Sequence, residues 1–178
     1  LWRELGGTFN GGVRDGAAGA DARLIASVQS PTFAEIARDI NKFSNNVMAR
    51  QLFLTLGAVG AGAPATTDKA DRVIRQWLAS KGLSFPELVL ENGSGLSRIE
   101  RISAKNLGQL LLMAFRSPVM PELIASLPLA AVDGTLKKRL SGAEVAGQAH
   151  LKTGSLSGVR SIAGYVLDAQ GRRVVVVF

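Results

Sequence analysis

The chain has 178 residues, of which 47% are hydrophobic and 20% are charged, and its formal net charge is +7. A chain of this length and composition can bury a core of its own, so a disordered protein is excluded. No apolar run approaches the roughly 18 residues that a transmembrane helix needs, and no membrane-spanning segment is expected. The chain contains no cysteine, which excludes disulfides and thiolate metal sites.

The excess of positive charge would suit nucleic acid, anionic lipid or an acidic polymer. Nucleic acid is disfavoured, because the basic residues are scattered and the densest run is only Lys137-Lys138-Arg139. Aromatic residues make up 6% of the chain, too few for a platform on which bases stack. We therefore predict no nucleic-acid partner.

The first 24 residues are rich in glycine and irregular. We expect residues 1–24 to be the tail of a preceding, inserted module, which returns through a short strand at residues 22–28. Residues 25–178 then form the main domain. The chain starts without methionine and stops inside a predicted strand at Phe178, so we expect both ends to be cut from a longer protein.

Helical periodicity and capping residues predict five helices before the strands. The first begins with Ser30 as its cap and Pro31 at its first position, and a polar break follows at residues 41–46. The second covers about residues 46–56 and stops at Gly57. The remaining three are a helix capped by Thr67 or Asp68 and ended by Gly82, a helix from a Ser103 cap to Pro118, and a short helix at residues 121–126.

Three strands are predicted at the end of the chain, at residues 148–153, 161–167 and 172–178. The Asp-Ala-Gln-Gly sequence at residues 168–171 provides a tight connection between the last two strands, which indicates an antiparallel pair. Helices therefore precede strands along the chain. The predicted fold class is α+β, with a helical cluster packed on a C-terminal antiparallel sheet.

Two triplets are typical of a serine acyl-transfer site. Ser44-Asn45-Asn46 has the Ser-x-Asn pattern between two predicted helices, and Lys152-Thr153-Gly154 lies on a strand that leads into a hairpin. Each triplet alone also has an ordinary explanation, since Ser-x-Asn often caps a helix and any strand can expose a lysine before a turn. The third part of such a site, a Ser-x-x-Lys that carries the nucleophile, does not occur in the chain.

Four runs of residues extend these triplets: Asn41-Lys42-Phe43-Ser44-Asn45-Asn46-Val47, Glu91-Asn92-Gly93-Ser94-Gly95-Leu96-Ser97-Arg98, Asp133-Gly134-Thr135-Leu136 and His150-Leu151-Lys152-Thr153-Gly154-Ser155-Leu156. In order and approximate spacing they resemble the class C low-molecular-mass penicillin-binding proteins, which are D-alanyl-D-alanine carboxypeptidases and endopeptidases. The resemblance covers nearly the whole chain but only the C-terminal part of such an enzyme. It implies an incomplete β-lactamase/transpeptidase-like domain at residues 25–178, truncated in its last strand.

The resemblance implies catalytic roles for three residues in acyl transfer to a serine. Ser44 would relay a proton between the nucleophile and the leaving amine, and Asn46 would hold the acyl-side amide of the peptide. Lys152 would stand near Ser44 as a fixed positive charge. Asn45 stands where the family often has Asp, and Ser155 where it often has Thr, and both replacements preserve polar function.

The resemblance also implies substrate-binding residues. The hydroxyls of Thr153 and Ser155 would bind the terminal carboxylate, and the backbone N–H of Ser155 would form half of the oxyanion hole. Gly154 would lack a side chain so that the substrate can approach the strand closely. Ser94 and Arg98 would contact the peptide side chain, with Arg98 either paired to a diaminopimelate carboxylate or simply solvated.

Other candidate residues have structural explanations. Thr66-Thr67-Asp68-Lys69 and Thr135-Leu136-Lys137-Lys138 have the nucleophile's spacing with threonine, but the first looks like a helix cap and neither has the flanks of a nucleophile. His150 is the only histidine and is expected to pack beside the cleft, because one histidine without cysteines makes no ordinary metal site. No glycine pattern indicates a nucleotide, so we predict neither cofactor nor metal.

We therefore interpret the chain as a fragment of a serine D-Ala-D-Ala carboxypeptidase/endopeptidase. The resemblance implies a hydrolase that acts on peptidoglycan stem peptides through an acyl-enzyme, binds β-lactams and works in the periplasm or elsewhere outside the cytoplasmic membrane. Without the nucleophile, the chain alone is predicted to be inactive. Two alternatives stay open: a serine β-lactamase of the same superfamily, and a non-catalytic cell-wall-binding module.

Overall fold

A computed structural model of the chain describes residues 2–12 and 15–178, which divide into two compact units, Leu1–Ser30 and Pro31–Phe178. The described residues of the first unit form turns but no helix or strand, so the strand predicted at residues 22–28 is wrong. Leu24, Ile25 and Val28 are almost fully exposed there. A strand is stable only when it exchanges hydrogen bonds with a neighbour, and this segment is paired with none of the described residues.

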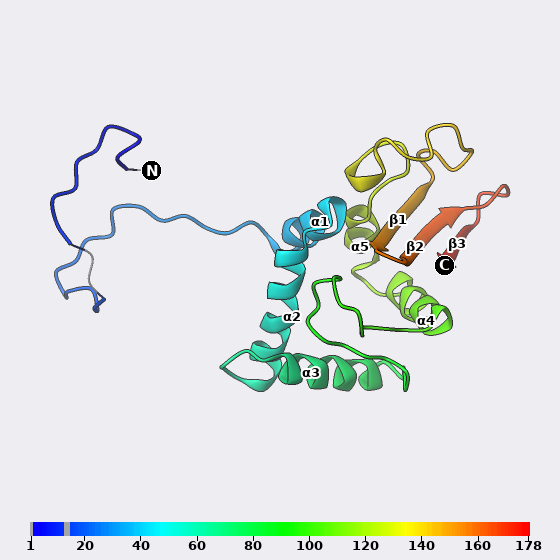
Figure 1. The fold of residues 1–178 in the computed structure, drawn as a ribbon, viewed down its shortest axis with the longest axis horizontal. Helices are drawn as coiled ribbons and strands as arrows, with labels where there is room; N and C mark the ends of the chain where they lie inside the picture. The colour runs from blue at the N-terminus through cyan, green and yellow to red at the C-terminus, as the bar shows by residue number, and fades with distance from the viewer. Residues whose placement is uncertain (1, 13–14) are drawn as a thin grey trace. The chain divides into compact units, whose positions relative to one another are not determined.

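The second unit confirms the α+β class, with helices first and strands last (Figure 1). None of its helices has the length and hydropathy of a membrane span, nor does any other described part of the chain. In order, the elements are α1 (Phe33–Phe43), α2 (Asn46–Ala61), α3 (Thr67–Ser80), α4 (Ala104–Phe115), α5 (Met120–Ser126), the short 3-10 helix η1 (Gly134–Leu136), β1 (Ala149–Leu156), β2 (Val159–Leu167) and β3 (Arg173–Val177).

Hydrogen-bonding side chains determine where the helices begin. Helix α1 starts after Thr32 rather than after Ser30, because the Thr32 hydroxyl accepts from the backbone N–H of Glu35 and the Glu35 carboxylate accepts from that of Thr32. Helix α3 is capped by Thr66, one residue before the predicted cap, and α4 is capped by Ser103 as predicted. The capping box of α1 satisfies two N–H groups at once, which no residue before Thr32 does.

Helix α2 continues past Gly57 to Ala61, so the predicted stop at Gly57 is wrong. Gly57 is buried where α2 crosses α3 (Figure 1). A Cβ at this position would lie 2.7 Å from the backbone nitrogen of Ala70. The glycine therefore serves the close approach of two helices and not the end of one.

The sheet has the order β1-β2-β3, and both strand pairs are antiparallel. Buried residues pack against both of its faces: Leu151 packs with Leu136 on one face, and Tyr165 packs with Ile124 of α5 on the other. The Tyr165 hydroxyl donates to the carbonyl of Leu111, which ties α4 to the second face. Because side chains alternate along a strand, Lys152 projects on the same face as Tyr165, toward the helices.

We predict that Gly57→Ala lowers the free energy of unfolding of the full-length protein by about 1–3 kcal/mol, because the added methyl group forces α2 and α3 apart. The matched control is Gly108→Ala in α4, where a Cβ would meet only Val177 at 3.9 Å. That substitution should stabilise by about 0.5–1 kcal/mol, the helix-propensity gain of alanine. Urea denaturation measures both, and equal effects at the two sites would contradict the role of Gly57.

Candidate active site

Ser44 is the first of the two residues that separate α1 from α2. It has φ 54° and ψ 47°, the left-handed conformation, and its backbone N–H caps α1 by donating to the carbonyl of Ile40. The next residue, Asn45, caps α2 with its side-chain oxygen, which accepts from the N–H of Met48 at 3.0 Å. The caps of the two helices therefore fix the backbone of Ser44, and with it the position from which its hydroxyl projects.

The Lys152 ammonium lies directly against this hydroxyl. Its Nζ donates to Ser44 Oγ at 2.7 Å and to the carbonyl of Thr153 at 3.0 Å. Burial lowers the pKa of Lys152, because an ammonium loses hydration in this half-buried position. The two groups that the sequence predicted to face each other do so, although they are 108 positions apart in the chain.

Asn46 and Ser94 form a second contact at the site. The Asn46 side-chain amide, at the first position of α2, donates to the backbone carbonyl of Ser94. Ser94 belongs to a loop that Glu100 anchors. The Glu100 Oε1 atom accepts hydrogen bonds of 2.9–3.0 Å from the backbone N–H groups of Glu91, Asn92 and Gly93. Sequence reasoning missed Glu100. A signal was present only in the spacing of an acidic residue after a glycine-bearing loop.

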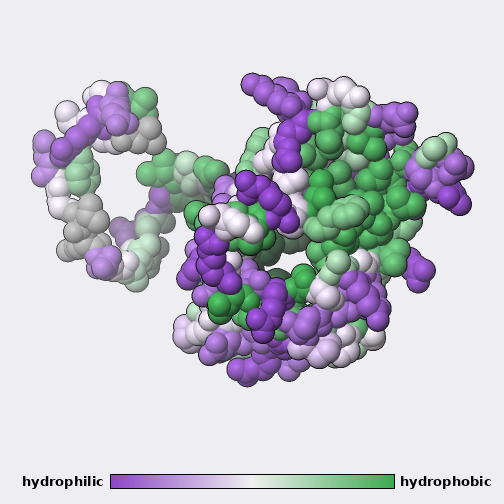
Figure 2. Space-filling view, turned by 45° about the vertical axis from the view of Figure 1, so that its right-hand side comes forward, coloured by the Kyte–Doolittle hydropathy of each residue, from purple (hydrophilic) through white to green (hydrophobic). Residues whose placement is uncertain are grey.

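A cleft of about 620 Å³ contains these groups. All but one of the predicted site residues line it, namely Ser44, Asn46, Ser94, Lys152, Thr153, Gly154 and Ser155. The rest of the lining includes the apolar side chains of Ile40, Leu107, Leu111, Leu127 and Phe178 and the polar side chains of Asn41, Asn45, Thr135 and Ser161. Figure 2 shows hydrophobic side chains gathered on the side of the main domain that carries the sheet. Val174 and Phe178 of the sheet region are among the exposed hydrophobic residues. The cleft therefore combines polar groups, several of them on β1 and at the start of α2, with apolar parts of its wall.

Arg98 does not line the cleft. Its side chain is exposed, and Nη1 donates to the carbonyl of Ser157 at 2.7 Å, in the turn between β1 and β2. Arg98 is thus neither a purely solvated residue nor a wall of the cleft. It links the loop of Ser94 to the hairpin that carries Lys152.

Gly154 has a neighbour that the sequence did not indicate. It pairs with Ser161 across β1 and β2, and a Cβ at Gly154 would collide with the Ser161 hydroxyl. The glycine therefore leaves room for a neighbouring side chain within the cleft.

Two further residues stand beside the site without having been assigned a role from the sequence. The Lys42 ammonium, two residues before Ser44, is buried and forms an ion pair with Asp133 at 2.6 Å. Asp133 begins the run Asp133-Gly134-Thr135-Leu136, and Thr135 lines the cleft. The run was recognised as a motif, but nothing local in it indicates a partner 91 residues away.

The residues with structural explanations have the predicted kind of role. Thr66 caps α3, and the Lys69 ammonium donates to the carbonyls of Gly62 and Pro64. His150 Nδ1 lies 3.0 Å from the carbonyl of Ile124, and burial lowers the pKa of this imidazole. Within residues 2–12 and 15–178, no group of three or more acidic or histidine side chains is arranged to hold a metal ion.

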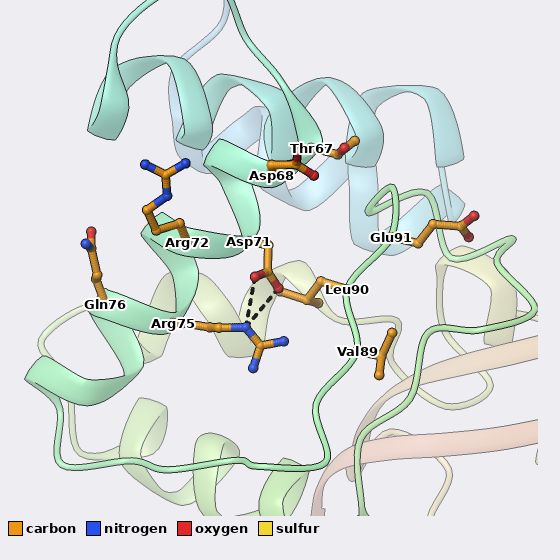
Figure 3. Close-up of a pocket in the computed structure, with 9 residues that line it drawn as sticks. All are labelled: Thr67, Asp68, Asp71, Arg72, Arg75, Gln76, Val89, Leu90 and Glu91. Atoms are coloured by element: carbon orange, nitrogen blue, oxygen red, sulfur yellow. Dashed lines mark hydrogen bonds and ion pairs between the residues drawn. The ribbon is translucent and has the colours of Figure 1, made fainter.

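A second, larger groove of about 760 Å³ lies between α3 and residues 89–91 (Figure 3). Most of its lining side chains are charged, and none belongs to the predicted site. Arg75 pairs with Asp71 at 2.9 Å and also donates to the carbonyl of Leu88. The bond to Leu88 connects α3 to the extended segment at residues 88–91. The groove is therefore the boundary where these two elements pack together.

Comparison with known proteins connects this geometry to a family. The family model described as D-Ala-D-Ala carboxypeptidase 3 (S13) matches residues 1–178. A D-alanyl-D-alanine carboxypeptidase of Actinomadura sp. (strain R39) is 36% identical over 156 residues, which are 85% of this chain and 29% of that protein. The carboxypeptidase DacB of Haemophilus influenzae is 29% identical over 177 residues, 98% of this chain and 37% of that protein.

A solved structure agrees with these sequence matches. The crystal structure of penicillin binding protein 4 (dacB) from Haemophilus influenzae, complexed with a β-lactam, superposes with a TM-score of 0.81 at 29% identity. The match covers 99% of this chain and 41% of that one. The chain therefore spans well under half the length of the relatives that it matches.

We predict that Glu100→Ala loosens the loop of Ser94, because three backbone N–H groups lose their acceptor. The free energy of unfolding of the full-length protein should fall by about 1–3 kcal/mol, and the amides of Glu91, Asn92 and Gly93 should exchange faster with solvent. Hydrogen exchange measures the second effect. The control Glu144→Ala removes an exposed carboxylate from a turn and should change neither quantity. Unchanged amide exchange in Glu100→Ala would contradict the anchoring role.

Proposed function

Because the chain belongs to the D-Ala-D-Ala carboxypeptidase 3 (S13) family, we propose that it is the C-terminal part of a serine DD-peptidase. Residues 25–178 contribute one wall of the active site, and residues 1–24 lead in from an inserted module. The observation that carries the proposal is the 2.7 Å contact between Ser44 Oγ and Lys152 Nζ inside a cleft. A hydroxyl beside a lysine with a lowered pKa is an arrangement suited to moving a proton.

The reaction is peptide-bond cleavage through an acyl-enzyme. A serine oxygen adds to the carbonyl carbon between the two terminal D-alanines, the C–N bond breaks, and the serine proton travels through Ser44 to the leaving amine. Water then hydrolyses the ester and frees the serine. Lys152 favours proton loss from the neighbouring hydroxyl and attracts the substrate's carboxylate, and Asn46 holds the acyl-side amide.

The edge of β1 binds the end of the substrate. The hydroxyls of Thr153 and Ser155 hold the terminal carboxylate, and the N–H of Ser155 donates to the developing oxyanion. Ser94 contacts the peptide side chain from the opposite loop. Arg98 keeps free N–H groups after its bond to Ser157, since a guanidinium has five, and these can pair with a carboxylate at the rim of the cleft.

The nucleophile is supplied by a part of the full-length protein outside this chain. No Ser-x-x-Lys occurs in the 178 residues, and the chain covers only 29–37% of its curated relatives. The apolar walls of the cleft support this assignment, because a polar stem peptide does not need them and a packed protein segment does. The chain alone is therefore inactive.

The biological setting follows from the substrate. Peptidoglycan lies outside the cytoplasmic membrane, so the full-length enzyme acts there, in the periplasm where one exists. The net charge of +7 helps to gather an anionic cell-wall polymer. Binding of β-lactams is proposed because they acylate serine DD-peptidases and because a related protein was crystallised with one.

We predict that the full-length protein is labelled covalently by a fluorescent penicillin, and that Lys152→Ala slows labelling by about a hundredfold or more. The loss is expected to be large because Lys152 acts together with Ser44 in the proposed proton transfer. The control Lys105→Ala removes an exposed lysine of α4 and should label at the normal rate. Gel fluorescence against time measures the rate.

Four results would oppose the proposal in different ways. Absence of labelling in the full-length wild type would remove the serine DD-peptidase function altogether. Normal labelling of Lys152→Ala would remove Lys152 from the mechanism. Label on the isolated 178-residue chain would show that the attacking group lies within it, and rapid turnover of penicillin without a lasting adduct would indicate a β-lactamase.

A further inference from the structure

We propose that the Lys42–Asp133 ion pair is a positioning device that sets the Ser44 hydroxyl at hydrogen-bonding distance from Lys152. The inference rests on the proposed function, because it assigns a purpose to the Ser44–Lys152 contact. It also gives a role to the Asp133-Gly134-Thr135 run, which the acyl-transfer mechanism leaves unused. Neither Lys42 nor Asp133 is assigned a contact with substrate.

The backbone of Ser44 needs external support. A left-handed conformation at a residue other than glycine costs about 1–2 kcal/mol, and such residues persist only where the surroundings impose them. If the last turn of α1 relaxed, Ser44 would be the first residue to move. Its hydroxyl would then leave the 2.7 Å contact with Lys152.

Lys42 anchors that last turn. Its Nζ donates to the carbonyl of Leu127 at 2.7 Å and to Asp133 Oδ2 at 2.6 Å, and the residue is only 9% exposed. The second carboxylate oxygen, Oδ1, accepts the backbone N–H of Leu129 at 2.8 Å. One carboxylate thus binds both the end of α1 and the segment that follows α5.

The same segment is bound to the strand of Lys152. The N–H of Leu151 donates to the carbonyl of Pro128 at 2.9 Å, and Leu129 forms a β-bridge with His150. These contacts form a closed ring. Lys42, two residues before Ser44, donates to Leu127, and the next residue, Pro128, accepts from Leu151. Lys152, the residue after Leu151, donates to Ser44 and completes the ring. The Lys42 side chain is therefore one link in the chain of contacts that connects the two ends of the Ser44–Lys152 hydrogen bond.

The loop of Asp133 fits against α1 through its backbone. Gly134 has φ +54°, and a Cβ there would lie 2.6 Å from the carbonyl oxygen of Lys42. A side chain at this position would push the end of α1 away. Helix α1 is held from two sides, by the ion pair and by the bare backbone of Gly134.

Asp133 is kept ionised in its setting. Burial by itself would raise the pKa of this carboxyl, but the N–H of Leu129 and the Lys42 ammonium hold the pKa below its ordinary value. Charge-assisted hydrogen bonds are short and directional, which makes them better than apolar contacts at holding one separation. The neighbouring Asn41 adds a hydrogen bond between neutral groups, donating to Ser126 Oγ at 2.7 Å.

The test uses the full-length protein and fluorescent penicillin over a range of concentrations. Asp133→Asn keeps the shape of the side chain and removes its charge. We expect its limiting acylation rate to fall about tenfold to a hundredfold, as misplacement of a reacting group does, with less than about a twofold change in the penicillin concentration at half the limiting rate. Lys42→Met should do the same, and the double variant should be no slower than either single one.

The matched control is Asp168→Asn. Asp168 also accepts backbone N–H groups and pairs with an arginine, Arg172 at 2.7 Å, but it lies in the turn between β2 and β3 and does not line the cleft. It should label at the wild-type rate. The control separates loss of any ion pair from loss of this one.

Wild-type acylation by Asp133→Asn, measured together with a lowered melting temperature, would show that the pair supports only the fold and would overturn the inference. If Asp133→Asn does not fold, Gly134→Ala decides, because it keeps both charges and displaces the end of α1: a slowed limiting rate supports positioning, and a normal rate overturns it. Absence of labelling in the wild type would instead contradict the proposed function, and the inference that rests on it would then also be wrong.

Discussion

The hydrogen bond from Lys152 to Ser44 joins the junction of two helices to one strand of a three-stranded sheet. Both groups lie on parts of the molecule that cannot shift alone. Ser44 is enclosed by the caps of α1 and α2, and Lys152 lies on a strand that pairs along its whole length with β2. The Lys42–Asp133 ion pair and the hydrogen bond from Leu151 to Pro128 connect these two supports through the segment that follows α5.

The site carries costs that the rest of the fold must offset. Ser44 has a strained backbone, the ammoniums of Lys42 and Lys152 are removed from much of their hydration, and the cleft leaves apolar walls unfilled. Well-packed clusters around Leu136, Leu78 and Tyr165 supply the compensating burial. Strain and desolvation therefore concentrate where the proposed chemistry takes place, as is usual for catalytic sites.

The cleft is assembled from segments that are distant in sequence and are tied together mainly by bonds to backbone groups. Glu100 binds three N–H groups beneath the loop of Ser94, Asn46 binds the carbonyl of Ser94, and Lys42 binds that of Leu127. The geometry of a hydrogen bond to a backbone group is determined mainly by the course of the backbone and only weakly by the neighbouring side chains. These bonds fix the positions of the segments that surround the cleft of about 620 Å³.

Local patterns in the sequence determined the α+β order, the five helices, the three antiparallel strands and the two polar triplets, because periodicity, caps and turns act over a few residues. The capping box of Thr32 and Glu35 is also a local pattern, and the cap predicted at Ser30 lies two residues before the observed one. Only the tertiary structure decided that Gly57 permits a helix crossing, that residues 22–28 stay unpaired, that Arg98 reaches the hairpin turn and that Lys42 meets Asp133. Each of these depends on segments brought together by packing, and contacts between distant segments leave no periodic trace in a single sequence.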